Sequence, residues 1–194
     1  MLASITPLGE RGRGSSWKVT ATAFAIGAIG AGAVGGLVLG ALGSLLPGGA
    51  TWRTVALAAL LLIAVLFDVT PLRSRLPTIR RQVNEDWMHR FRGWVYGIGF
   101  GAQLGVGLAT IVSSAAVYAT VACALLCGNA LIGAAIGATF GAIRALSLLP
   151  ARRVNDPRAL FALHQRLTRF EAGAQRAVVA GELIALVAVI GALA

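Results

Sequence analysis

Long apolar stretches separated by polar gaps run through the whole chain. The stretches are residues 19–46, 52–69, 94–127, 130–149 and 177–194. A helix needs about 20 apolar residues to cross a bilayer, so each stretch is a candidate span, taken with its flanks where it is short. The pattern predicts an all-α, polytopic membrane protein with about five transmembrane helices.

The polar gaps divide the chain into one membrane domain and its flanking segments. We expect a cytoplasmic tail over residues 1–18 and a single transmembrane domain over 19–194. The gaps 70–93 and 150–176 are predicted as cytoplasmic loops because they hold most of the arginines. Within the second loop, Asn155-Asp156-Pro157 is a typical helix start. The apolar positions after it predict an amphipathic helix that leads into the last span.

Three of the apolar stretches carry a glycine at every fourth position. The triplets are Gly32/Gly36/Gly40, Gly97/Gly101/Gly105 and Gly133/Gly137/Gly141. Residues four apart lie on one face of a helix, so each triplet leaves a strip without side chains. Membrane helices associate through such strips of small residues, and we therefore expect Gly-xxx-Gly packing between the spans.

Two of these triplets are followed by the same short sequence. Gly40-Ala-Leu leads to Ser-Leu-Leu-Pro47, and Gly141-Ala-Ile leads to Ser-Leu-Leu-Pro150. The two spans run in opposite directions by the charge argument, so the similarity favours an inverted repeat, as in many transporters. Coincidence in a chain rich in alanine, glycine and leucine is the alternative.

Composition supports a membrane location. The chain is 57% hydrophobic and 12% charged, with a mean hydropathy of +0.80. Its net charge of +10 lies between the spans and not on a soluble face, which argues against a nucleic-acid partner. With arginine-rich gaps inside, the N-terminus is cytoplasmic and the C-terminus is outside, in a bacterial inner membrane. Beyond the lipid bilayer, another membrane protein or a second copy of the chain is a candidate partner.

The stretch 94–127 is too long for a simple span. As one straight helix it would measure about 50 Å, against a hydrocarbon core of about 30 Å. It is either strongly tilted and projecting, or broken, with Ser113 and Ser114 as the expected position of a break. A break at membrane depth is tolerated only beside protein or a water-lined cavity.

Polar residues inside apolar stretches are the candidates for binding a substrate. Glu182 lies in the last span, where a carboxylate either serves a function or pairs with an arginine near the interface. The other cavity candidates lie in the stretch 94–127 and are Gln103, Thr110, Ser113 and Ser114. For Gln103, a hydrogen bond to a neighbouring helix is the alternative. Asp68, at the end of the second span, is expected to pair with an arginine of the following loop.

Cys123 and Cys127 lie four residues apart on one helical face. Such a pair can bind a soft metal or exchange disulfides, whereas buried cysteines usually act as small apolar residues. The two histidines lie in the predicted loops, so we expect no metal site and no cofactor. No nucleophile–base arrangement is present in the sequence. The chain is therefore not expected to be an enzyme, with thiol–disulfide transfer as the one enzymatic interpretation.

The residues Phe100 to Thr110 (FGAQLGVGLAT), with Gly137-Ala-Thr-Phe-Gly141 further on, resemble part of a known membrane family. This is the family of cytochrome c biogenesis (CcdA) and DsbD transmembrane domains, which have six spans in an inverted repeat. The resemblance implies that the first of these spans is missing here. Gly105 and Thr110 stand where the family has its Pro-Cys pair, so the resemblance implies the architecture without the redox site.

The leading functional hypothesis is passage or binding of a small substrate between the two halves of the repeat. A non-catalytic membrane subunit that docks a partner's helices on its glycine grooves is the second. Thiol electron transfer through Cys123 and Cys127 is the third.

Overall fold

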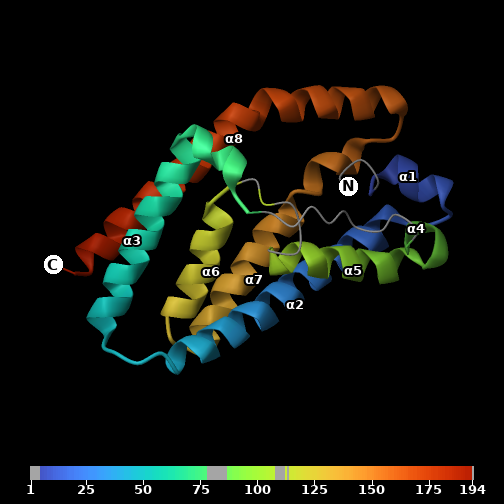
Figure 1. Cartoon of the computed structure of the whole chain (residues 1–194). Helices are drawn as coiled ribbons and strands as arrows, with labels where there is room; N and C mark the ends of the chain where they lie inside the picture. Colours follow the sequence, from blue (N-terminus) through green and yellow to red (C-terminus); the bar gives the residue numbers. More distant parts are fainter. Residues whose placement is uncertain (1–4, 78–86, 108–111, 113, 194) are drawn as a thin grey trace.

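The computed structural model describes residues 5–77, 87–107, 112 and 114–193, and all regular structure within these ranges is helical (Figure 1). The elements are α1 (Pro7–Gly12), α2 (Trp17–Ser44), α3 (Ala50–Val69), η1 (Pro71–Arg75), α4 (Trp87–Arg90), α5 (Gly93–Val106), α6 (Ala116–Leu126), α7 (Ala130–Leu146), η2 (Leu149–Arg153) and α8 (Pro157–Gly191). The predicted all-α class is confirmed. Four helical segments are long and apolar enough to cross a membrane, namely Trp17–Ser44, Ala50–Val69, Ala130–Arg153 and Pro157–Gly191.

Helix α2 is the centre of the bundle, and α7 packs against it in the opposite direction. A Cβ atom added at Gly32 would overlap the carbonyl oxygen of Gly137, and one at Gly36 would overlap that of Gly133. At the two ends of this contact, Gly40 meets Asn129, and Gly141 meets Ala28. The two backbones are therefore so close that no side chain fits between them.

Helix α5 packs on a second face of α2 and runs in the same direction. Gly97, Gly101 and Gly105 lie against the backbone of Thr20, Phe24 and Ala28, in that order. The carbonyl group of Ala28 therefore faces glycines of both α5 and α7. All nine glycines of the three triplets are buried inside the chain.

The stretch 94–127 is not one long span. Helix α5 ends at Val106, and Gly107 follows with a φ of +75°, a conformation that favours glycine and stops the helix. Helix α6 begins at Ala116 and has 11 residues, after the 14 residues of α5. At 1.5 Å per residue, each is well short of a hydrocarbon core of about 30 Å. Of the two alternatives for this stretch, a broken helix is therefore correct.

Helix α8 joins what we expected to be a loop and a span. It has 35 residues and begins where Asp156 caps it, the carboxylate accepting from the amide of Ala159 at 2.8 Å. Figure 1 shows its first part lying across one end of the bundle and its second part running beside α3. The boundary predicted between residues 176 and 177 thus falls inside a continuous helix, because the amphipathic segment and the span share one helical register.

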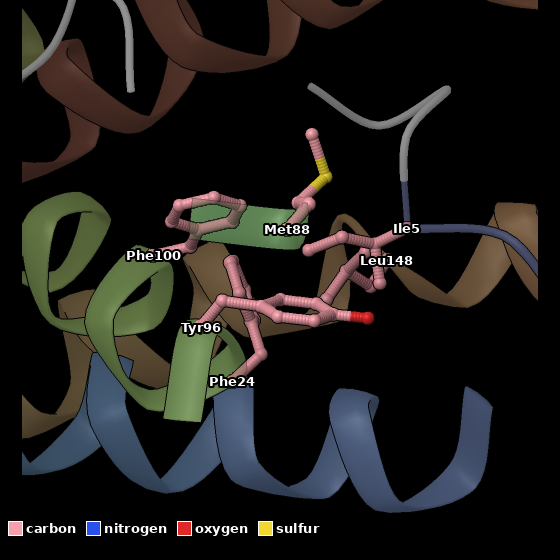
Figure 2. Packing of buried hydrophobic residues seen from close by; sticks show 6 residues of the cluster. All are labelled: Ile5, Phe24, Met88, Tyr96, Phe100 and Leu148. Atoms are coloured by element: carbon pink, nitrogen blue, oxygen red, sulfur yellow. The ribbon is translucent and has the colours of Figure 1, made fainter. Parts of the chain in front are cut away.

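The N-terminal segment is folded onto the bundle. Thr6 and Pro7 begin α1, the hydroxyl of Thr6 accepting from the amide of Gly9 at 3.1 Å. Figure 2 shows Ile5 with five other buried apolar side chains from separate parts of the chain, which are Phe24, Met88, Tyr96, Phe100 and Leu148. Ile5, Thr6 and Glu10 are thus buried against the bundle, within the segment 1–18 that was expected to be a tail.

Candidate functional site

The end of α3 holds a buried carboxylate that binds the first turn of α6. Asp68 is 2% exposed and accepts from the hydroxyl of Ser114 at 2.5 Å and from the amide of Ala115 at 2.9 Å. Amide groups at a helix N-terminus have no partner within the helix and carry partial positive charge. Asp68 therefore supplies both the acceptors and the negative charge that the start of α6 requires.

Helix α8 also contacts the end of α3 at Asp68. The side-chain amide of Gln175 donates to the carbonyl oxygen of Asp68 at 3.0 Å. Gln175 is seven residues before Glu182, so the two side chains share one face of α8, two turns apart. That face is the one that packs on α3, and Leu186, one turn beyond Glu182, is buried with Leu61 and Ala64 of α3.

Glu182 is a second buried carboxyl group in this region, and it differs from Asp68 in its surroundings. It is 5% exposed, and neither of its side-chain oxygens has a hydrogen-bond partner among the described residues. Glu182 lies two helical turns from Gln175, which bonds to the backbone of Asp68. Burial of an unpaired carboxylate is costly, whereas burial of a neutral carboxyl group costs much less. Of these two acids, only Asp68 has hydrogen-bond donors among the described residues.

A cavity of about 420 Å³ opens beside Asp68, between the end of α3 and the middle of α8. Gln175 and Arg176 are its other polar lining residues, and the remainder of the wall is Val69 with apolar residues of α8. Arg176 is exposed, so one wall of the cavity carries a positively charged guanidinium group that reaches the molecular surface.

A second cavity, of about 310 Å³, lies on the other side of α6, among α2, α5 and α7. Its walls are glycines of the packed faces together with Val106, Val117, Val121 and Phe140. The hydroxyl of Thr120 also lines it but donates to the carbonyl oxygen of Ala116 at 2.8 Å. This cavity offers apolar surface and suits a hydrocarbon group, not a polar substrate.

The residues predicted as a cavity from the sequence have different positions in the structure. Ser114 binds Asp68, and Glu182 lies buried close by. Gln103 is half-buried on α5 and lines neither of these two cavities. Thr110 and Ser113 lie outside the described residues. An arginine partner was the alternative to a functional role for Glu182, and none is found among the residues that the structure describes.

Asp68 adds a residue to the site. Its described side-chain partners are Ser114 and Ala115. Arg80 and Arg81, two arginines of the loop that was expected to hold its partner, lie outside the described residues. The two contacts span sequence separations of 46 and 47 residues, and no local sequence pattern indicates such a pairing. The available signal was the serine pair in a stretch too long to be one helix, because a helix start inside a membrane domain needs an acceptor.

Glu10 is a buried carboxylate in the segment that was expected to be a tail. It accepts from the hydroxyls of Tyr96 at 2.6–2.7 Å and Thr20 at 2.7 Å, and it forms an ion pair with Arg13 at 2.7 Å. Burial lowers the pKa of Arg13, but the hydrogen bonds and charges of Glu10 and Tyr96 outweigh it and hold the pKa above its ordinary value. These partners satisfy Glu10, which therefore fixes α1 to α2 and α5.

The cysteines lie at the far end of α6 from Asp68. Cys123 is within the helix and Cys127 is its C-cap, and both are free and partly buried. The thiol of Cys127 donates to the carbonyl oxygen of Ala124 at 3.1 Å. No group of three or more metal-ligating side chains is found among the described residues.

Comparison of the chain with protein-family models, with curated proteins and with solved structures gives no match. The resemblance to cytochrome c biogenesis and DsbD transmembrane domains therefore stays a prediction from the sequence.

Proposed function

We propose that this chain is an integral protein of the bacterial inner membrane that binds or passes a small substrate between two inverted halves. Its N-terminus would be cytoplasmic and its C-terminus outside, as the arginine-rich segments before α5 and around η2 favour. In this arrangement α2, α3, α7 and α8 each cross the bilayer, and α5 and α6 together make one discontinuous crossing.

The contacts between α2 and α7 support the inverted repeat. The sequence similarity makes Gly32 equivalent to Gly133, and Gly36 equivalent to Gly137. Gly32 lies against Gly137 and Gly36 against Gly133, so exchanging the two helices converts each contact into the other. The Gly40–Asn129 and Gly141–Ala28 contacts are exchanged in the same way. This is the behaviour expected of two helices related by a two-fold axis in the membrane plane.

The observation that carries the proposed function is the start of α6 inside the domain, bound to Asp68 and close to Glu182. Discontinuous helices form binding sites in many transporters because their exposed ends offer unpaired backbone groups. A carboxyl group at membrane depth is a functional candidate by default, and no side chain or backbone group in the described part of the chain pairs with Glu182. The substrate that suits two neighbouring acids is a proton or a small molecule with a cationic group.

Reaction with dicyclohexylcarbodiimide tests this site directly. The reagent enters bilayers and modifies protonated carboxyl groups in apolar surroundings. In vesicles that contain the protein, we expect modification at Glu182, measured by mass spectrometry of the digested chain, and none in the Glu182→Gln variant. Glu171→Gln is the matched control, because Glu171 is exposed on the same helix. An unmodified Glu182 would contradict a protonated, reachable carboxyl group.

Proton entry into proteoliposomes tests passage through the site. A pH-sensitive dye inside the vesicles reports the rate after an external acid pulse. We expect wild type and Glu171→Gln to exceed protein-free liposomes, and Glu182→Gln to fall to the protein-free rate. A wild-type rate equal to that of empty liposomes would contradict proton passage and leave binding as the part to be tested with the carbodiimide.

A further inference from the structure

Two basic cavities lie side by side at the α1 end of the bundle, far along α2 from its contact with Asn129. The first, of about 520 Å³, is lined by three arginines, which are Arg13, Arg90 and Arg92. The second, of about 760 Å³, is lined by four cationic residues, which are Arg11, Lys18, Arg152 and Arg153. No acidic residue is among the described residues that line either cavity.

Ser15 and Ser16 form the wall that the two cavities share. The backbone amide of Ser15 donates to the carbonyl oxygen of Glu10 at 2.9 Å, and the Glu10 side chain is bound to Arg13, Thr20 and Tyr96. This wall is therefore held in place by the buried network around Glu10. Glu10 itself is fully buried and is paired with Arg13, so among the described lining residues the positive charge of the two cavities exceeds the negative charge beside it.

The walls also carry apolar surface next to the cations. Val19, Phe91 and Trp94 line the first cavity and are largely exposed, and Trp17 lines the second. Aromatic residues beside basic ones are typical of the membrane interface, where lipid headgroups meet the acyl chains. The first turns of α2 and α5 also open on the first cavity, and neither cap residue binds its own helix with its side chain. The backbone amides of these first turns are therefore further hydrogen-bond donors for an anion, beside the arginine side chains.

We propose that these paired cavities bind the phosphate groups of anionic phospholipids. Guanidinium groups recognise phosphate through paired hydrogen bonds, and the apolar residues beside them suit the start of the acyl chains. The combination of both surfaces favours a lipid headgroup over free phosphate. This site is separate from Asp68 and Glu182, so lipid binding here does not depend on the proposed passage of a substrate.

Titration of the purified protein in neutral detergent tests the site, with tryptophan fluorescence as the readout because Trp17 and Trp94 line the cavities. We expect phosphatidylglycerol to give a saturable change that phosphatidylcholine does not give. Arg92→Gln and Arg153→Gln, one for each cavity, should each raise the apparent Kd about fivefold, with a larger effect in the double variant. Arg169→Gln is the matched control, since Arg169 is exposed on α8 and lines neither cavity.

Three results would overturn the proposal. Equal responses to the two lipids would show that charge is not recognised. Equal effects of Arg92→Gln, Arg153→Gln and Arg169→Gln would show general attraction in place of a site. The same saturable response to inorganic phosphate alone would assign the cavities to a free anion. Because Arg92 and Arg153 are exposed, the variants should fold, and far-ultraviolet circular dichroism with gel filtration in the same detergent checks this.

Discussion

The helix pairs α2–α7 and α3–α8 are built on different principles. Helices α2 and α7 share the most extensive contact in the chain, with glycines against backbone and no room for a side chain. Helices α3 and α8 share a much smaller contact made by ordinary apolar side chains, and this contact holds the buried acids Asp68 and Glu182. The first pair is suited to be a fixed frame, because close-packed backbones tolerate no displacement. Under the proposed function, the second pair is the part that would open and close around a substrate.

This difference implies that equally small changes have unequal effects in the two pairs. A membrane domain gains little from apolar burial between helices, so close packing and hydrogen bonds decide its stability. Packing is concentrated in α2–α7, and hydrogen bonding at the α3–α8 contact is concentrated on Asp68.

The largest effect is expected from a side chain placed between α2 and α7. Leucine at Gly36 or Gly137 would require the helices to separate, since even a Cβ overlaps the facing carbonyl oxygen. We expect loss of the monodisperse peak in detergent gel filtration. Gly30→Ala is the control in α2 and Gly181→Ala the control in α8, because nothing lies within 4 Å of a Cβ at either position. A well-folded Gly36→Leu protein would refute the fixed frame.

The second prediction separates the two acids of the α3–α8 pair. Asp68→Ala leaves the start of α6 without its acceptors and should cost about 1–3 kcal/mol, the usual effect of an unsatisfied buried donor. Glu182→Leu removes a carboxyl group that has no described partner, and should leave stability unchanged or raise it. Thermal unfolding in detergent, followed by tryptophan fluorescence, measures both. If Glu182→Leu is as destabilising as Asp68→Ala, Glu182 has a structural role and its functional assignment fails.

A smaller effect is expected at the α1 end of the frame. Tyr96→Phe removes one of three hydrogen-bond donors to Glu10 and should lower the free energy of unfolding by about 1 kcal/mol. Tyr118→Phe is a control on another helix, since that hydroxyl is exposed where it donates to the carbonyl of Pro77. Limited proteolysis should also cut the Tyr96→Phe protein more rapidly before residue 17. Equal proteolysis of the two variants would mean that Glu10 does not hold α1 in place.

Local and periodic features of the fold could be predicted from the sequence. The apolar stretches gave the positions of α2, α3 and α7 to within a few residues, because hydrophobic length and polar gaps mark helices directly. The excess length of 94–127 indicated that this stretch is not a simple span, and it left two alternatives, a strongly tilted and projecting helix or a broken one. Continuity of α8 could not be predicted, since the charges of 150–176 mark a loop and a helix surface equally well.

The site was less predictable because its parts are distant in sequence. Glu182 and Ser114 were found because a polar residue in an apolar stretch is unusual wherever it occurs. Asp68 was noted, but its bonds to Ser114 and Ala115 were not predicted, since these two residues lie far along the chain. Glu10 was missed because a polar segment before the first span gives no sign of burial.

The smallest effect is expected from the cysteines, and it bears on the third functional hypothesis. Cys123 and Cys127 lie on α6 away from Asp68, free and partly buried, where sulfur packs as a small apolar group. The double variant Cys123→Ser/Cys127→Ser should therefore unfold within about 0.5 kcal/mol of wild type, as substitutions away from buried networks do. Its rate of proton entry into proteoliposomes should equal that of wild type. A rate reduced to the level of Glu182→Gln, with unfolding unchanged, would instead move the function from the acids of α3 and α8 to the thiols of α6.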